Sequence, residues 1–264
     1  MTEKKEELMS GQSVFDFTGK SVIVTGAASG AGRATSLAFA HTGADLTIGD
    51  IQAGAMAEVA AEIRRLGRRA EVVQVDVCDE GQVQKLADGA LSAYGRIDIL
   101  VNAAGVILRK ASLEYTLKEW DWVVDVSLKG TWLCSQKVGA IMVRQGSGSI
   151  INFASGAAMR GMVGYPAYGP AKAGIINLTK GLAVEWGRQG VRINAVMPGF
   201  LNTPFNQAIL ADPKVTAARV ANTPIAAKPM EPEDLVPAIM FLCSEGAKWI
   251  TGATLPVDGG NSAR

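Results

Sequence analysis

Short runs of β-branched and other apolar residues alternate along this chain with longer segments of helical composition. The runs occupy residues 21–25, 44–49, 71–75, 97–101, 149–153, 191–196 and 254–257. The helical segments lie at residues 34–42, 53–66, 80–94, 117–144, 168–186 and 232–242. Strands that are separated by helices of this length pair in parallel, and the helices cover both faces of the sheet. The alternation therefore predicts the α/β class.

Because crossover connections are right-handed, about seven such strands predict a Rossmann-like, doubly wound parallel sheet with helices on both faces. No internal repeat or Pro/Gly/Ser-rich linker divides the 264 residues. Residues 17–264 are therefore predicted to form a single dinucleotide-binding and catalytic domain, preceded by a flexible tail at residues 1–16. Residues 203–222 are predicted to be a helical insertion, and residues 117–144 two helices broken near Lys129 and Gly130.

The composition excludes several classes of function. The net charge is +1 and the charges are dispersed, so no basic stripe indicates a nucleic-acid partner. No run approaches the 18 apolar residues of a membrane span, and the first ten residues lack the apolar core of a signal peptide. Three cysteines without a CxxC spacing fit reduced thiols in the cytoplasm. With His41 as the single histidine, no metal site and no Ser-His-Asp relay is expected.

The segment between the first predicted strand and the first predicted helix is rich in glycine. It reads TGAASGAG over residues 25–32. Glycines at such a turn allow backbone amides to reach a pyrophosphate, which a helix N-terminus also favours. The spacing is not GxGxxG, and a plain strand-to-helix turn is the alternative. Its position nevertheless predicts nucleotide binding by Gly26, Ser29, Gly30, Ala31 and Gly32.

Asp50 follows the second predicted strand, 24 residues after Gly26. A carboxylate there can accept hydrogen bonds from both adenosine ribose hydroxyls and repels a 2′-phosphate. Ser29 and Ile51, where a cation would meet that phosphate, are uncharged. The pattern predicts NAD rather than NADP as cofactor, and the alternative role for Asp50 is a helix N-cap.

Tyr168 and Lys172 lie four residues apart in a predicted helix and therefore share one helix face. An adjacent cation lowers the pKa of a tyrosine, which is about 10 when free. Such a tyrosine can take a proton from an alcohol as hydride leaves, or supply one to a ketone. Ser155, just beyond the fifth strand, could hydrogen-bond the same substrate oxygen. By spacing alone, the two residues could equally be a surface pair.

Taken together, these residues resemble the classical short-chain dehydrogenase/reductase family over about residues 19–260. The loop at residues 25–32 matches the family's TGxxxGxG, and Ser155, Tyr168 and Lys172 match its serine and YxxxK. Further motifs match at Asp76, Val77, Asn102, Ala103, Ala104, Gly105, Pro198, Gly199 and Thr203, and the ending ITGATLPVDGG is typical. The resemblance implies that these residues and Ile51 surround the cofactor, with the nicotinamide beside Tyr168 and its ribose against Lys172.

The resemblance also implies a mobile substrate lid near residues 203–222. It implies a homotetramer, or a homodimer, assembled through the helix that carries Tyr168 and through the 117–144 region. Trp120, Trp122 and Trp132 lie in that region and could serve such an interface or the core equally well.

One position departs from the family pattern. The family's fourth catalytic residue, an asparagine, aligns with Ser127 in the segment VSLKG. In the family that asparagine holds a kinked helix and a water that relays protons from the lysine. A serine hydroxyl can bond water but lacks the paired donor and acceptor of an amide. Ser127 is therefore predicted to be catalytic in an altered relay, with slower turnover or a shifted pH optimum.

The predicted function is an NAD(H)-dependent oxidoreductase for a secondary alcohol or ketone. The alternatives are a catalytically weakened nucleotide-binding relative and a family member of another reaction class, such as a dehydratase or epimerase. Arg109, Lys110 and residues 183–186 are similar to segments of gluconate and polyol dehydrogenases, which favours a sugar acid or polyol. Phe205, Ile209 and Leu210 in the insertion instead suit an apolar ketone or cyclic alcohol.

Overall fold

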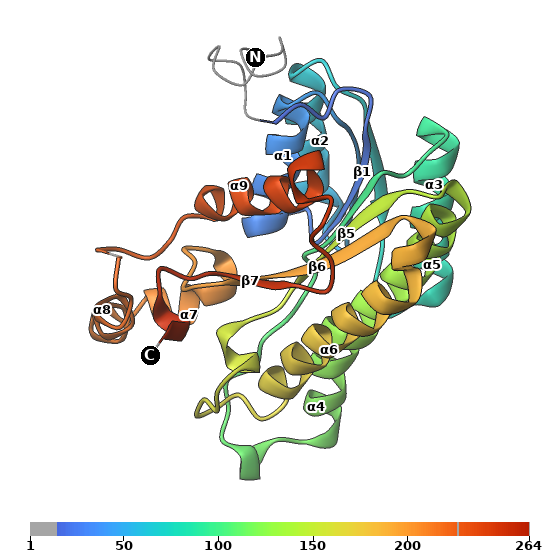
Figure 1. Cartoon of the computed structure of the whole chain (residues 1–264). Coiled ribbons are helices and arrows are strands. Elements are labelled where there is room, and N and C mark those ends of the chain that lie inside the picture. The colour runs from blue at the N-terminus through green and yellow to red at the C-terminus, as the bar shows by residue number, and fades with distance from the viewer. Residues whose placement is uncertain (1–14, 226, 264) are drawn as a thin grey trace, which may run out of the picture.

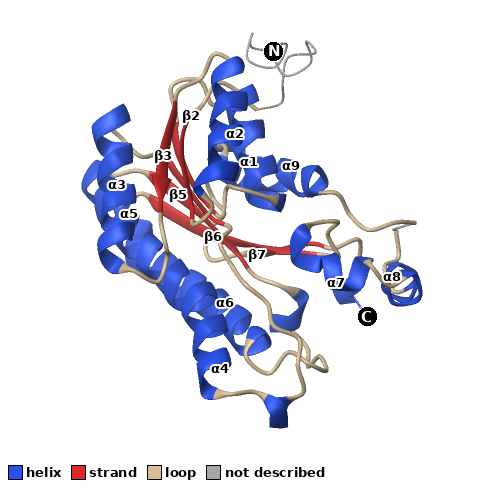
Figure 2. Cartoon of the chain, turned by 180° about the vertical axis from the view of Figure 1, so that it is seen from behind, coloured by secondary structure: helices blue, strands red, loops and turns tan. Residues whose placement is uncertain are grey.

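The computed structural model describes residues 15–225 and 227–263. A seven-stranded parallel sheet runs through the molecule in the order β3-β2-β1-β4-β5-β6-β7 (Figures 1 and 2). Its strands are β1 (Ser21–Thr25), β2 (Asp45–Asp50), β3 (Ala70–Gln74), β4 (Ile99–Asn102), β5 (Gly148–Phe153), β6 (Val191–Pro198) and β7 (Thr254–Val257). The predicted seven-stranded parallel sheet is therefore confirmed.

Helices cover both faces of this sheet, as predicted (Figure 1). One layer consists of α1 (Gly30–His41), α2 (Ala53–Arg65) and α9 (Pro232–Cys243), and the other of α3 (Glu80–Tyr94), α5 (Gly130–Gln145) and α6 (Tyr168–Trp186). Each layer forms a separate apolar cluster with the sheet, and Phe39 in one and Leu86 in the other are fully buried. Because both faces are covered, every residue of the central strands β1 and β4 is buried, and neither strand alternates between buried and exposed positions.

The order of the strands creates a crevice. β1 pairs with both β2 and β4, although β2 and β3 lie between β1 and β4 in the chain. The connections therefore leave β1 and β4 in opposite directions, and such switch points open a ligand crevice at the carboxyl ends of the strands. The glycine-rich loop follows β1, and Ala103 to Gly105 follow β4.

The predicted insertion consists of three short helical pieces between β6 and α9. They are η7 (Pro204–Asn206), α7 (Gln207–Leu210) and α8 (Pro213–Ala221). These pieces project from the sheet beyond its carboxyl ends, apart from the two covering layers (Figures 1 and 2). Their role as a lid stays a prediction.

Two local predictions differ from the structure. Helix α1 begins at Gly30 rather than near residue 34, so part of the glycine-rich loop forms its first turn. The expected break near Lys129 and Gly130 is instead a π-helical turn, η4 (Asp125–Lys129), that joins α4 (Leu117–Val124) to α5 without interruption. Gly130 is required for packing, because a Cβ there would lie 2.5 Å from Val77 Cγ2.

The predicted tail lies mostly outside the described residues, since the structure describes nothing before residue 15. Within the tail, Phe15 packs against the core and its ring stacks on Phe17 at a centroid distance of 6.4 Å. In the described ranges, no helix is long and apolar enough to cross a membrane. The same residues contain no cluster of three or more His, Cys, Asp or Glu side chains that could hold a metal ion.

Candidate active site

A cavity of about 1120 Å³ lies at the carboxyl ends of the strands. Typical small-molecule sites measure roughly 300–1,000 Å³, so this cavity has room for a dinucleotide and a substrate together. Two of the predicted site residues, Asn102 and Ser127, do not line it. The others do: Gly26, Ser29, Gly30, Ala31, Gly32, Asp50, Ile51, Asp76, Val77, Ala103, Ala104, Gly105, Ser155, Tyr168, Lys172, Pro198, Gly199 and Thr203.

The glycine-rich loop is shaped by close backbone contacts. Gly26 has a φ of +66°, and a Cβ there would lie 2.7 Å from the amide nitrogen of Ala104. Gly30 has a φ of +51°. The first turn of α1 contains no acidic residue, and its N-cap Ser29 makes no side-chain capping bond. The N-terminal amides of α1 therefore face the cavity without a capping anion, which fits the pyrophosphate of a dinucleotide.

Asp50 ends strand β2 beside this loop. One carboxylate oxygen accepts a hydrogen bond from Ala28 N at 3.1 Å, and the other accepts one from Gln52 N at 3.0 Å. Arg33, which directly follows the glycine-rich loop, donates to both carboxylate oxygens of Glu62 at 2.7 Å. A guanidinium held in this way is not available to a phosphate on the adenosine ribose.

The loops after β3 and β4 complete the half of the cavity that is lined by the residues predicted to bind the nucleotide. This half, at positions 26–52, 75–78 and 103–105, is called the nucleotide half below. Asp76 accepts a hydrogen bond from Cys78 N at 2.9 Å and so holds the turn that carries Val77. Burial raises the pKa of the Cys78 thiol to about 11, so this lining cysteine is not a thiolate at neutral pH.

Asn102 belongs to a buried polar network behind the cavity rather than to its wall. Its side-chain amide donates to Ser135 Oγ at 3.0 Å and to Asn152 Oδ1 at 2.9 Å, and Asn152 in turn donates to Thr179 Oγ1 at 3.0 Å. These bonds tie β4 and β5 to the helices α5 and α6. Asn102 therefore fixes the position of the 103–105 loop instead of presenting its side chain to a ligand.

The opposite half of the cavity begins after β6. Gly199 N donates to Val257 O at 2.9 Å, and a Cβ on Gly199 would lie 2.8 Å from Asp258 Cα. Thr203 is buried, and its Cγ2 would lie 3.2 Å from a Cβ on Gly30. The start of the insertion thus touches the glycine-rich loop.

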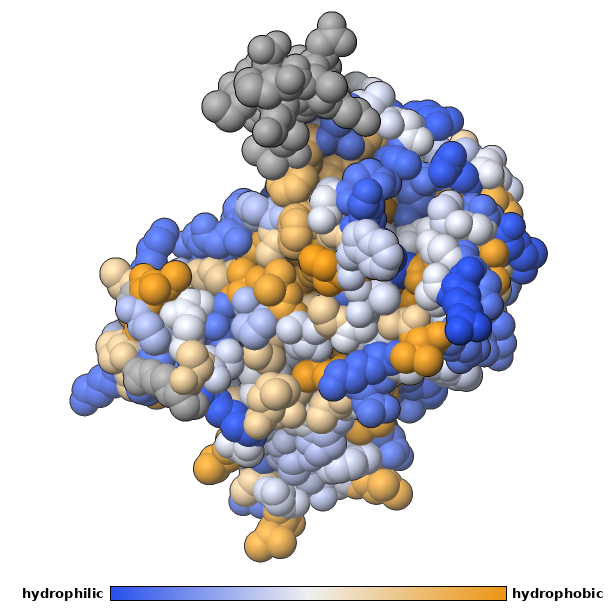
Figure 3. All heavy atoms as spheres, viewed as in Figure 1, coloured by the Kyte–Doolittle hydropathy of each residue, from blue (hydrophilic) through white to orange (hydrophobic). Residues whose placement is uncertain are grey.

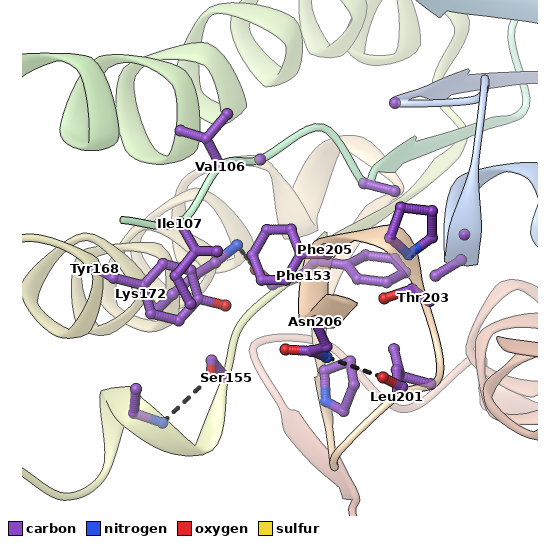
Figure 4. A pocket seen from close by; sticks show the side chains of 18 of the residues that line it. Val106, Ile107, Phe153, Ser155, Tyr168, Lys172, Leu201, Thr203, Phe205 and Asn206 are labelled. Atoms are coloured by element: carbon purple, nitrogen blue, oxygen red, sulfur yellow. Dashed lines mark hydrogen bonds between the residues drawn. The ribbon is translucent and has the colours of Figure 1, made fainter. Parts of the chain in front are cut away.

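Tyr168, Lys172 and Ser155 lie together on one side of the cavity, opposite Thr203 (Figure 4). Tyr168 is the first residue of α6, and Lys172 follows one turn later on the same face. Lys172 Nζ donates to Phe153 O at 2.7 Å and lies 5.7 Å from the Tyr168 ring centroid. Ser155 Oγ accepts a hydrogen bond from Ala157 N at 3.2 Å, which orients the hydroxyl.

Burial dominates the electrostatics of the pair. It raises the pKa of Tyr168 to about 12, although Ser155 and Arg109 act to lower it. Burial also lowers the pKa of Lys172 to about 8, because the side chain has lost its hydration. The prediction that the tyrosine pKa is lowered is therefore wrong, because burial outweighs the groups that lower it. Tyr168 is a neutral phenol near pH 7 and can donate a proton.

Ser127 lies in the π-helical turn η4 and is fully buried. Its hydroxyl lies 3.5 Å from Val106 O. A Cβ on Gly105 would lie 3.9 Å from Ser127 Oγ and 3.7 Å from Lys172 Nζ, so both side chains approach the same side of Gly105. The serine is thus near the lysine but behind the wall of the cavity.

Several residues of the substrate half were not predicted as site residues. Tyr165, Asn206 and Arg219 line the cavity, and Arg109 bonds to the first two of them. A basic residue in a predicted lid was the available sequence signal for Arg219. The predicted pair of cations divides: Arg109 lines the cavity, whereas Lys110 donates to both carboxylate oxygens of Glu119 at 3.0 Å.

Comparisons with known proteins agree with this geometry. A family model described as Enoyl-(Acyl carrier protein) reductase matches residues 26–262. The chain is 40% identical to cis-4-hydroxycyclohexanecarboxylate dehydrogenase of Sinomonas cyclohexanicum, over 94% of this chain and 98% of that protein. It is 34% identical to 2-dehydro-3-deoxy-D-gluconate 5-dehydrogenase of Escherichia coli, over 96% and 99% of the two chains. A structure from Beutenbergia cavernae, provisionally named an NAD(P)-dependent gluconate 5-dehydrogenase and holding NADP at low occupancy, is similar with a TM-score of 0.90 and 36% identity, over 96% and 100% of the chains.

Proposed function

The chain belongs to the short-chain dehydrogenase/reductase family of oxidoreductases that act on alcohols and ketones, and we propose that it moves hydride between NAD(H) and a secondary alcohol or ketone. The observation that carries this proposal is the convergence of Ser155, Tyr168 and Lys172 on one cavity with the glycine-rich loop. A bound nicotinamide supplies the hydride donor or acceptor.

In the reducing direction, the Tyr168 hydroxyl gives its proton to the ketone oxygen as hydride reaches the carbonyl carbon. In the oxidising direction, the phenolate takes the alcohol proton as hydride leaves. Ser155 Oγ holds the same substrate oxygen by a hydrogen bond. Lys172 keeps a cation beside the tyrosine below its pKa of about 8, which favours the phenolate once the proton has been given.

The test is Tyr168→Phe, which removes the proton donor and keeps the ring. We expect kcat to fall by at least 100-fold, since general acid–base catalysis contributes about 10²–10⁴-fold. NADH binding, measured by fluorescence titration, should change by less than about threefold.

Unchanged turnover of Tyr168→Phe would refute the mechanism. Turnover without net NADH change in the wild type would favour a dehydratase or epimerase instead. NADH binding without turnover in any screen would favour the catalytically weakened relative.

We propose NAD rather than NADP as the cofactor. The proposal is supported by Asp50 at the end of β2 and by the engagement of Arg33 with Glu62. In the nucleotide half of the cavity, the lining residues come from positions 26–52, 75–78 and 103–105. Among these described lining residues, Asp50 and Asp76 are acidic and none is a lysine or arginine. A 2′-phosphate beside Asp50 would face a carboxylate without a side-chain cation among these residues to balance it.

For the substrate, we propose a sugar acid or polyol, with a cyclic or apolar alcohol as the second candidate. The first is supported by the similarity to the gluconate dehydrogenase relative and by Arg109 in the cavity. The second is supported by the similarity to the hydroxycyclohexanecarboxylate dehydrogenase and by Phe205, whose ring lies 6.0 Å from that of Tyr168. A screen of NAD reduction by gluconate, polyols, cyclic hydroxy acids and hydroxysteroids distinguishes them.

We also propose a homotetramer, or a homodimer, that works in the cytoplasm. Apolar residues reach the surface at the end of the molecule that carries α4 (Figures 1 and 3). Leu117, Trp120, Trp122 and Trp132 are all exposed in this region, which suits an interface better than a core. The cysteines Cys78, Cys134 and Cys243 are free thiols, in keeping with a reducing compartment. Light scattering gives the number of subunits.

A further inference from the structure

The substrate half of the cavity holds a cluster of two arginines around one phenol. Arg109 Nε donates to Tyr165 Oη at 2.8 Å, and Arg219 Nη2 donates to the same oxygen at 3.1 Å. Arg109 Nη2 also donates to Asn206 Oδ1 at 2.8 Å. Both arginines are half-buried, and the Tyr165 ring lies 5.8 Å from that of Tyr168. The cluster is therefore adjacent to the proposed proton donor.

The partners of these arginines in the cluster are neutral. In the part of the chain that the structure describes, no ion pair within 4.0 Å includes Arg109 or Arg219. Of the nearby acidic groups, Glu119 is held by Lys110. Asp258 accepts hydrogen bonds from the backbone amides of Gly260 and Ser262. Two guanidinium groups thus share one cavity wall without a negative charge between them.

The phenol of Tyr165 has an unused proton. A tyrosine hydroxyl has two acceptor lone pairs and one O–H donor. Both lone pairs are taken by the arginines, and among the described residues the hydroxyl makes no hydrogen bond as a donor. The free N–H groups of two arginines and the free O–H of Tyr165 are all donors. Such a set of donors suits an anion. A neutral hydroxyl group of a substrate, bound in the same place, would leave the positive charge of the two arginines uncompensated.

We propose that Arg109 and Arg219, bridged by Tyr165, bind a carboxylate on the substrate and so select hydroxy acids or keto acids over their neutral analogues. This inference rests on the proposed oxidoreductase function and names its substrate class. The substrate carbon that exchanges hydride must lie beside Tyr168, whose ring is 5.8 Å from that of Tyr165. The carboxylate is therefore a few bonds away from that carbon.

The cluster also joins two parts of the chain. Arg109 belongs to the loop after β4, whereas Arg219 belongs to α8 of the insertion, where its Cζ lies 5.5 Å from the Phe200 ring centroid. A carboxylate held by both arginines therefore links the insertion to the body of the protein across the substrate. This link adds to the Arg219–Tyr165 and Arg109–Asn206 hydrogen bonds, which already join the insertion to the body.

The test compares each acid with its carboxamide: gluconate with gluconamide, and 4-hydroxycyclohexanecarboxylate with 4-hydroxycyclohexanecarboxamide. We expect the wild-type kcat/KM of one pair to favour the acid by at least tenfold. Arg219→Gln should lower kcat/KM for that acid by about 10- to 100-fold, as expected for loss of a charge-assisted contact, and leave the amide within threefold. Tyr165→Phe should act in the same direction, and Arg219→Lys should recover part of the loss.

The matched control is Lys180→Gln, which removes a positive charge outside the cavity. Lys180 is exposed on α6 and does not line the cavity, so the acid-to-amide ratio should stay within threefold of the wild type. Equal losses for acid and amide in Arg219→Gln, or a wild-type preference for the amides, would overturn the proposal.

Calorimetric titration of the enzyme–NADH complex with the acids and amides tests the carboxylate site separately from the proposed oxidoreductase function. Acid binding that depends on Arg219, without any turnover, supports the carboxylate site and contradicts the proposed oxidoreductase function. Turnover of neutral alcohols without selectivity for acids contradicts the carboxylate site and supports the oxidoreductase. Absence of Arg219-dependent binding and of acid turnover contradicts the carboxylate site.

Discussion

Replacing Lys172 with methionine should stabilise the ligand-free protein near neutral pH. The buried lysine has its pKa lowered from 10.5 to about 8, chiefly by burial. Each unit corresponds to about 1.4 kcal/mol, so carrying the charge costs the folded state about 3 kcal/mol below pH 8. Methionine removes this cost but leaves Phe153 O without its donor, which costs about 1–2 kcal/mol. The net gain in unfolding free energy at pH 7 is therefore about 1–2 kcal/mol.

The dependence on pH isolates the lysine from other effects of the substitution. The folded pKa lies below the unfolded one, so the unfolded chain keeps the proton to higher pH. The wild type consequently gains stability as the pH rises from about 8 towards 10.5, whereas the variant lacks this contribution. Between pH 7 and pH 9.5 the wild type should gain about 2 kcal/mol relative to Lys172→Met.

Urea denaturation of both proteins at pH 7 and pH 9.5, without cofactor, measures this difference. Lys180→Met is the matched control, because Lys180 is exposed on the same helix α6. The control should not reproduce the pH-dependent change. If the unfolding free energies of wild type and Lys172→Met differ by the same amount at the two pH values, the reasoning is refuted. The folded state would then not lower the pKa of Lys172.

Two further substitutions test the cofactor and the proton relay. Asp50→Ala should lower the ratio of kcat/KM for NAD over NADP by about 10- to 100-fold, because it removes the charge that repels a 2′-phosphate; an unchanged ratio in steady-state assays would contradict the role of Asp50. Ser127→Asn should raise turnover or shift the pH profile of kcat by restoring an amide donor and acceptor beside Lys172. If both stay as in the wild type, Ser127 has no part in proton transfer.

The sheet could be predicted from the sequence because its signal is local. Each buried strand is a short apolar run bounded by turn residues, and the crossover rule orders the strands. The sequence predicts the limits of α1 and α5 less accurately, because glycine has a low helix propensity and so indicates a break. In the structure Gly30 begins α1 and Gly130 continues the helix from η4. A side chain would crowd Thr203 at the first position and Val77 at the second.

The substrate half could not be predicted in the same way. Arg109, Tyr165 and Arg219 lie up to 110 residues apart in the chain, and no spacing rule joins them. Asn102 shows the opposite case. The motif predicts Asn102 as a cofactor-binding residue, but in the fold it does not line the cavity and its amide donates to Asn152 and Ser135.

The attachment of α7 and α8 has an evolutionary consequence. The proposed catalytic residues stand on α6 and just after β5, inside the packed body of the protein, whereas the insertion meets that body through side chains such as Arg219 and Thr203. Substitutions in the insertion can therefore change which molecule is admitted while the residues of α6 itself stay the same. Drift in this one segment would let duplicated genes acquire new substrates while they inherit the same chemistry.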